Sequence, residues 1–245
     1  MTPARRRLDL IPGTLCDERL WARLAPQLTD FDLHHVPLHK ARTRAQMQEL
    51  IAAHSAPKSN LVGFSLGAYL AVEYAVAHPE RIETLVLIAN SCKGLLPAEV
   101  EARKRIVAML QKNAYSGMTR HRLRELLHPD HVTDQSITGL IQEMAVDLGK
   151  EVLLTQFTTT IDRVDYMDRL HALPFPVLIV GAEGDQLVDA ADLREMAALL
   201  PDVRLRTIAG DADVEEPSGH MIPLEAPETL AGWIRSFHAE LPALA

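Results

Sequence analysis

One short stretch has the residue types of a nucleophilic catalyst: positions 63–67, with the sequence Gly-Phe-Ser-Leu-Gly. It lies between an apolar run at 60–62 and a helix-like run at 68–75. A strand that ends in Gly-x-Ser-x-Gly and turns sharply into a helix exposes the serine hydroxyl at the apex of the turn. In such a turn a Cβ at either glycine would collide with the adjoining strand or helix. Ser65 is therefore the candidate nucleophile.

A serine hydroxyl needs a base beside it, and the base needs a carboxylate to orient it. When the serine follows a strand in this way, the order along the chain is serine, acid, histidine. Of the eleven histidines, only His220 lies both late in the chain and in a loop. That loop precedes the last helix, and His220 directly follows Ser218-Gly219. His220 is the candidate base. The remaining histidines and both cysteines lack the spacing of metal ligands, so no metal site is expected.

The acid is expected in the loop after an apolar run at 177–180, because ligand chemistry in open α/β sheets gathers at the carboxyl ends of the strands. Asp185 is the candidate, and Glu183 and Asp189 in the same loop remain alternatives. Two backbone N–H groups must bind the oxyanion: one from the residue after the nucleophile and one from the loop after the first strand. Leu66 and Thr14 fit, although Pro12-Gly13 before Thr14 is also an ordinary turn signal.

Short apolar runs alternate with amphipathic segments, a pattern typical of parallel strands joined by crossover helices. We expect strands at 8–11, 32–38, 61–63, 82–89, 176–181 and 203–208, and helices at 18–28, 43–54, 68–78, 190–200 and 227–238. Residues 94–173 contain no clear strand, only helical periodicity with turn signals at 116–117, 128–129 and 149. We therefore predict an α/β core of residues 1–93 and 174–245 that carries a helical insertion at 94–173.

Four motifs follow one another along nearly the whole chain: Leu10-Ile11-Pro12-Gly13 with Trp21, Gly63-Phe64-Ser65-Leu66-Gly67, Gly184-Asp185-Gln186-Leu187-Val188, and Gly219-His220-Met221 before Glu225-Ala226-Pro227-Glu228. Together they resemble the α/β-hydrolase superfamily, and the chain is similar to small bacterial esterases of the carrier-protein methyl ester esterase type. The resemblance implies a mostly parallel sheet flanked by helices, a four-helix lid and no cofactor. It also implies a Ser65-His220-Asp185 triad that cleaves a small acyl ester through an acyl-enzyme.

The chain departs from the superfamily pattern at three places. Pro12 replaces the histidine usual in the His-Gly oxyanion motif, which leaves the backbone donor in place. Ala68 stands where many relatives have a third glycine. Only seven residues precede the first strand, so the usual N-terminal hairpin should be missing and the sheet should have about six strands. The acidic stretch Asp211 to Glu216 predicts a lengthened loop before His220. A thioester, an amide or a carbon–carbon bond stays open as the bond cleaved, as does a silent hydrolase fold that only binds a small molecule.

The insertion is expected to shape the substrate pocket. Apolar residues at helical spacing form either an acyl pocket or the packing of the lid on the core, and we single out Met118, Phe157, Tyr115 and Leu153. The first half of the insertion is basic, through Arg103, Lys104, Arg105, Lys112, Arg120, Arg122 and Arg124. These side chains either dock an acidic carrier protein or form a solvated face.

Charge and hydropathy exclude two classes of partner. The net charge of −8 argues against nucleic-acid binding, which needs a basic face. The longest stretch without a charge, 59–72, is shorter than the roughly 20 residues that span a bilayer. We therefore expect a cytoplasmic protein, monomeric or homodimeric, that acts on a small molecule away from membranes.

Overall fold

The computed structural model describes residues 5–209 and 216–241. Six strands form one sheet in the order β2-β1-β3-β4-β5-β6, and every neighbouring pair is parallel. Their bounds are β1 Arg6–Ile11, β2 Phe31–His35, β3 Ser59–Phe64, β4 Ile82–Ile88, β5 Val177–Ala182 and β6 Val203–Ile208. The expected fold class, a parallel sheet of six strands flanked by helices, is confirmed.

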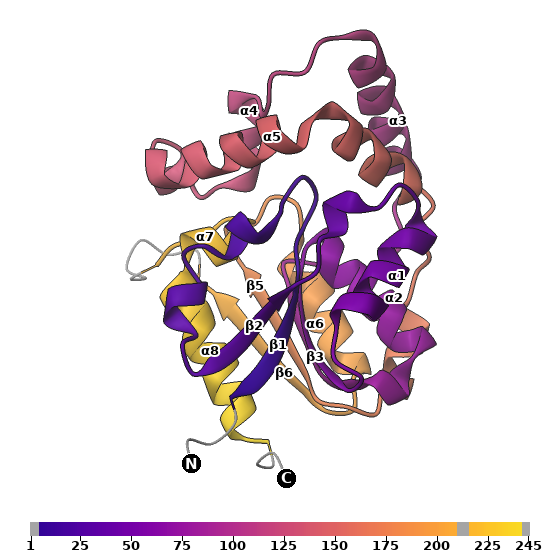
Figure 1. Cartoon of the computed structure of the whole chain (residues 1–245), viewed down its shortest axis with the longest axis vertical. Helices are drawn as coiled ribbons and strands as arrows, with labels where there is room; N and C mark the ends of the chain where they lie inside the picture. The colour runs from indigo at the N-terminus through magenta and orange to yellow at the C-terminus, as the bar shows by residue number, and fades with distance from the viewer. Residues whose placement is uncertain (1–4, 210–215, 242–245) are drawn as a thin grey trace.

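Helices cover both faces of the sheet (Figure 1). They are α1 Arg44–His54, α2 Leu66–Ala77, α3 Pro97–Lys112, α4 Arg120–Leu126, α5 Gln135–Thr159, α6 Ala190–Leu199, α7 Ile222–Glu225 and α8 Pro227–Ala239. Apolar residues of α8 pack with one face of the sheet. Those of α1, α2 and α6 pack with the other face. Helices on both faces explain why the central strands β3 and β5 are buried along their whole length, and why β5 is a continuous apolar run.

Two expected elements differ from the structure. The expected helix at 18–28 is a pair of short 3-10 helices, Glu18–Trp21 and Ala25–Gln27, with Pro26 in the first turn of the second. The expected strand at 32–38 ends at His35, before Pro37, which precedes a third 3-10 turn, Leu38–Lys40. Proline lacks the N–H that a ladder or the interior of a helix requires, so Pro37 ends the strand and Pro26 divides the expected single helix into two. The expected long loop at 211–216 lies outside the described residues except for Glu216.

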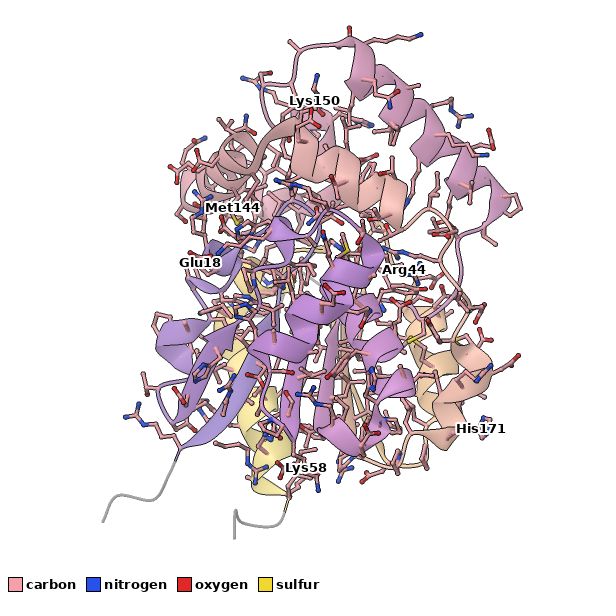
Figure 2. The ribbon with its side chains drawn as sticks, turned by 45° about the vertical axis from the view of Figure 1, so that its right-hand side comes forward. Glu18, Arg44, Lys58, Met144, Lys150 and His171 are labelled. Atoms are coloured by element: carbon pink, nitrogen blue, oxygen red, sulfur yellow. The ribbon has the colours of Figure 1, made fainter. Side chains whose placement is uncertain are left out.

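Helices α3, α4 and α5 lie between β4 and β5 in sequence and above one edge of the sheet (Figure 1). Gly149 interrupts α5 with φ 74°, so α5 is two helices joined at a kink, and Gly117 between α3 and α4 has φ 101°. Both positions match turn signals in the sequence. Met144 of α5 is fully buried and lies above Glu18 of the core, whereas Lys150 lies on the outer side (Figure 2). None of the described helices is long and apolar enough to cross a bilayer.

Candidate active site

Ser65 occupies the turn between β3 and α2 in a backbone conformation that few residues adopt, with φ 50° and ψ −115°. Such a conformation costs about 1–3 kcal/mol and persists only where the surroundings hold it. The Ser65 N–H donates to the Ile88 carbonyl of β4 at 2.9 Å. A Cβ on Gly63 would come within 2.7 Å of the Ala68 nitrogen, and one on Gly67 within 2.3 Å of the Ile11 oxygen. The close packing of strand, turn and helix therefore requires both glycines.

His220 lies between the two other residues that the sequence predicts. Its Nε2 is 2.9 Å from Ser65 Oγ, and its Nδ1 is 2.8 Å from Asp185 Oδ2. The Phe64 ring packs against the imidazole, with ring centres 5.2 Å apart. The side chains of His220 and Asp185 are 4% and 1% exposed. In this arrangement the serine hydroxyl donates to Nε2 and Nδ1–H donates to the carboxylate, the geometry of an activated nucleophile.

Both carboxylate oxygens of Asp185 have hydrogen-bond partners. While Oδ2 contacts His220, Oδ1 accepts the backbone N–H groups of Leu187 at 2.8 Å and Val188 at 3.2 Å. Asp189 has a different partner, because its carboxylate caps α6 by accepting the Ala191 N–H at 2.8 Å. The structure thus brings Asp185, and not Asp189, to the histidine.

The two expected oxyanion donors lie on either side of the serine turn. Leu66 is the first residue of α2, where the N–H groups of a helix face outward and attract negative charge. Thr14 follows Gly13, on which a Cβ would lie 3.3 Å from the Ser65 Cβ. Within the described chain neither the Thr14 nor the Leu66 N–H has a hydrogen-bond partner. Both donors are therefore free to bind a ligand.

The loop after Thr14 is fastened by the insertion. Leu15 has φ 55°, and its N–H donates to Gln156 Oε1 of α5 at 2.8 Å. Gln156 is 1% exposed, and its Nε2 is buried without a hydrogen-bond partner in the described structure. No sequence pattern predicts this role, because a glutamine within an apolar helix carries no signal of its partner 141 positions away.

A buried carboxylate that the sequence analysis did not assign holds the His220 loop. The Glu225 side chain is 0% exposed, and its Oε2 accepts the N–H groups of Gly219 and Met221, both at 3.0 Å. Its Oε1 accepts the His128 N–H at 2.7 Å and contacts His131 Nδ1 at 3.1 Å. The hydrogen bond to Glu225 raises the pKa of His131. The sequence gives one sign of this role: Glu225 is the single charged residue in the apolar run that follows His220.

The insertion also touches the His220 loop directly. The carbonyl of Leu126, the last residue of α4, accepts the His220 N–H at 2.8 Å and the Met221 N–H at 3.3 Å. A Cβ on Gly219 would lie 2.7 Å from the His128 nitrogen, so only glycine permits this approach. The position of the histidine therefore depends on both the core and the insertion.

The four residues expected in the substrate pocket lie in two places. Tyr115, Met118 and Leu153 pack around Leu15, in the loop that carries Thr14. Burial raises the pKa of Tyr115 to about 12, and its hydroxyl has no partner among the described residues. Met118 also borders a surface cleft of about 570 Å³ between α4 and α5. Phe157 lies two residues before the end of α5, with an arginine of α3 over its ring.

Comparison with known proteins gives three findings. The model of a family described as alpha/beta hydrolase fold matches residues 11–227. A protein of Azorhizobium caulinodans described as a carbamate hydrolase is 26% identical over 169 residues, 66% of this chain and 62% of that protein. A pimeloyl-[acyl-carrier protein] methyl ester esterase of Klebsiella pneumoniae is 31% identical over 93 residues, 34% of this chain and 36% of that protein. The matches thus span under two thirds of either relative.

A solved structure shares the fold over nearly the whole chain. It is a thermophilic esterase from Thermogutta terrifontis with malate bound, and it superposes with a TM-score of 0.82 at 20% identity. The superposition covers 98% of this chain and 91% of that one.

Proposed function

We propose that this chain, a member of the α/β-hydrolase family, is a hydrolase that cleaves carboxylic esters through an acyl-enzyme intermediate. Ser65 is the nucleophile, His220 the base and acid, and Asp185 the residue that orients His220. The observation that carries the proposal is the chain of two short contacts, 2.9 Å from Ser65 Oγ to His220 Nε2 and 2.8 Å from His220 Nδ1 to Asp185 Oδ2.

The reaction follows from this geometry. Ser65 Oγ attacks the ester carbonyl while His220 Nε2 takes the hydroxyl proton, and the carbonyl electrons move onto oxygen. The N–H groups of Thr14 and Leu66 bind that oxyanion. When it collapses, the carbon–oxygen bond to the alcohol breaks and His220 gives the proton to the leaving alcohol. Water then attacks the acyl-Ser65 ester by the same steps and releases the acid. We infer that the insertion at 94–173 covers the site as a lid.

The test is hydrolysis of aryl esters of graded acyl length by the purified protein. Ser65→Ala should keep the fold and lower turnover by a factor on the order of a million, if triad precedents apply. Ser116→Ala, at an exposed serine of the insertion, is the matched control and should leave turnover unchanged. More than a few per cent of activity in a clean Ser65→Ala preparation would refute the assignment.

Another acyl substrate is the second candidate, because one of the relatives is described as a carbamate hydrolase. The same triad would then act on a bond to nitrogen, and His220 would protonate an amine. A panel of matched ester, thioester, carbamate and anilide substrates with one acyl group separates the candidates. We expect the ester to have the highest kcat/KM.

A further inference from the structure

Two half-buried arginines outside the triad lie near the end of α5: Arg103 on α3, which contacts Thr160, and Arg163, which follows α5 and lies over Tyr69 of the core. The guanidinium carbon of Arg163 is 4.7 Å from the centre of the Tyr69 ring. That of Arg103 is 5.4 Å from the centre of the Phe157 ring. Each cation therefore rests on an aromatic face, which leaves the donor-bearing edge of the guanidinium available.

Within the described residues no carboxylate oxygen lies within 4.0 Å of Arg103 or Arg163, and the charge of Glu99 on α3 acts on both from a longer distance. Arg163 Nε is buried without a hydrogen-bond partner, and Arg103 reaches only Thr160, at 3.2 Å from Nη1 to Oγ1. By contrast, the neighbouring Arg44 pairs with Glu73 at 2.8 Å. Figure 2 shows Arg44 near the junction between core and insertion.

Burial disfavours the charged form of both arginines. Burial and, as a smaller cause, the positive charge of Arg103 together lower the pKa of Arg163 to about 10. Burial also lowers the pKa of Arg103. Desolvated like charges are costly unless an opposite charge with matching hydrogen bonds compensates them. An anion bound between the two guanidinium groups would supply this compensation.

The pair adjoins the triad on two sides. Tyr69, under Arg163, is one turn of α2 beyond Ser65 and donates its N–H to the Ser65 carbonyl at 3.1 Å. Arg163 therefore lies over a side chain from the first turn of the helix that begins directly after the nucleophile. On α5, Gln156 holds the oxyanion loop, and Thr160, one turn later, accepts from Arg103. A chain bound as an ester at Ser65 can therefore extend toward the arginines.

We propose that Arg103 and Arg163 bind a carboxylate at the far end of the substrate's acyl chain. The substrate class is then a monoester of a dicarboxylic acid, and the inference rests on the proposed function because it places the ester at Ser65. A guanidinium matches a carboxylate with two parallel N–H···O bonds. The acyl side is favoured because Phe157, beneath Arg103, belongs to the segment expected to form the acyl pocket.

The test compares two p-nitrophenyl esters of equal chain length, the monoglutarate and the valerate, which differ by a terminal carboxylate against a methyl. The wild type should hydrolyse the monoglutarate with a kcat/KM at least tenfold higher. Arg163→Gln and Arg103→Gln should each lower that value tenfold or more and change the valerate value much less. Arg105→Gln, which removes an exposed charge from the same helix, is the control and should alter neither.

A binding experiment separates this site from the reaction. Glutarate titrated calorimetrically into the Ser65→Ala variant should bind, and the double variant with Arg163→Gln should lose that binding. A wild type that prefers the valerate, or an Arg163→Gln variant that loses both esters equally while its melting temperature is unchanged, would overturn the proposal. If neither ester is hydrolysed but glutarate binds through Arg163, the carboxylate site stands and the esterase reaction is wrong.

Discussion

At the scale of single residues, Asp185 differs from its neighbours in what its two oxygens contact. One oxygen orients His220 and the other accepts two backbone N–H groups of its own loop. An amide at this position puts an NH₂ donor against either the imidazole N–H or the loop N–H groups. Asp185→Asn should therefore lower kcat by about 10⁴, as the loss of an orienting carboxylate does in other triads.

The controls for this prediction lie in the same loop. Asp189→Asn should lower kcat less than twofold, because asparagine also caps helices well. Glu183→Gln should likewise have little effect. A larger loss in Asp189→Asn than in Asp185→Asn would contradict the assignment.

Glu225 is buried, and both of its carboxylate oxygens contact hydrogen-bond donors. Its two oxygens face the N–H groups of Gly219, Met221 and His128 and the His131 ring. In Glu225→Gln the NH₂ group must face at least one of these donors, and an unsatisfied buried donor costs about 1–3 kcal/mol. We expect a lower free energy of unfolding in urea and about a tenfold lower kcat, because the His220 loop is no longer held.

Glu228→Gln is the matched control, three residues further on and exposed to solvent. It should leave both the urea midpoint and kcat unchanged. A Glu225→Gln protein with wild-type kcat would show that the buried carboxylate stabilises the fold without positioning the histidine.

At the scale of elements, the close approach of α2 to the end of β1 depends on Gly67. A Cβ on Gly67 would lie 2.3 Å from the Ile11 oxygen and 2.5 Å from the Pro12 oxygen, both backbone atoms. Backbone that is paired in a sheet cannot move aside cheaply, so Gly67→Ala should destabilise the protein by about 3 kcal/mol or more. Thermal unfolding followed by circular dichroism measures the effect.

Glycine-to-alanine substitution at Gly232 tests whether the loss at Gly67 comes from the clash of the added Cβ. Gly232 lies in the interior of α8, and a Cβ there meets nothing within 4 Å. Alanine is a better helix former than glycine by about 1 kcal/mol, so Gly232→Ala should raise the melting temperature. If both substitutions lowered it equally, the loss at Gly67 would reflect glycine replacement in general and not the packing of the turn.

The insertion is tied to the core at the loops of His220 and Thr14, the proposed base and a proposed oxyanion donor. Leu126 and His128 hold the His220 loop, and Gln156 holds the loop of Thr14. An insertion attached only at its ends could be exchanged without effect on the proposed triad. Here its removal would also release the two loops on which the proposed reaction depends.

At the scale of the whole molecule, a buried histidine joins the two ends of the described chain. His238 of α8 packs against Phe31, and its Nδ1 lies 3.2 Å from Arg6 Nη1 of β1. Burial and the Arg6 charge lower the pKa of His238 to about 4. The unfolded chain takes up the proton near pH 6.5 and the folded protein does not, so stability is present above pH 6.5 and is lost as the pH falls toward 4.

The shift predicts a loss of about 3 kcal/mol in the free energy of unfolding between pH 7 and pH 4 from this residue alone. His238→Leu removes the titrating group, so its free energy of unfolding should fall less steeply over the same range. Urea denaturation at half-unit pH intervals gives both curves. Parallel curves for the wild type and the variant would contradict the assignment.

The sequence by itself determined the strands, the serine turn and the chain order of the site residues. These follow from local rules, because period-2 and period-3.6 patterns and the glycines of a strained turn act over a few neighbouring residues. Prolines ended one expected segment early and divided another for an equally local reason. The turn signals inside the insertion, at Gly117 and Gly149, were legible in the same way.

Only the tertiary structure decided which carboxylate meets His220, what holds that loop and where the charges of the insertion lie. Glu225 contacts His128 across 97 residues, and Gln156 contacts Leu15 across 141. Arg103 and Arg163 are brought to one junction by packing, so the sequence showed only a basic segment. Such contacts depend on how the helices pack on the sheet. No short-range pattern encodes the distance between two side chains that meet only after the chain has folded.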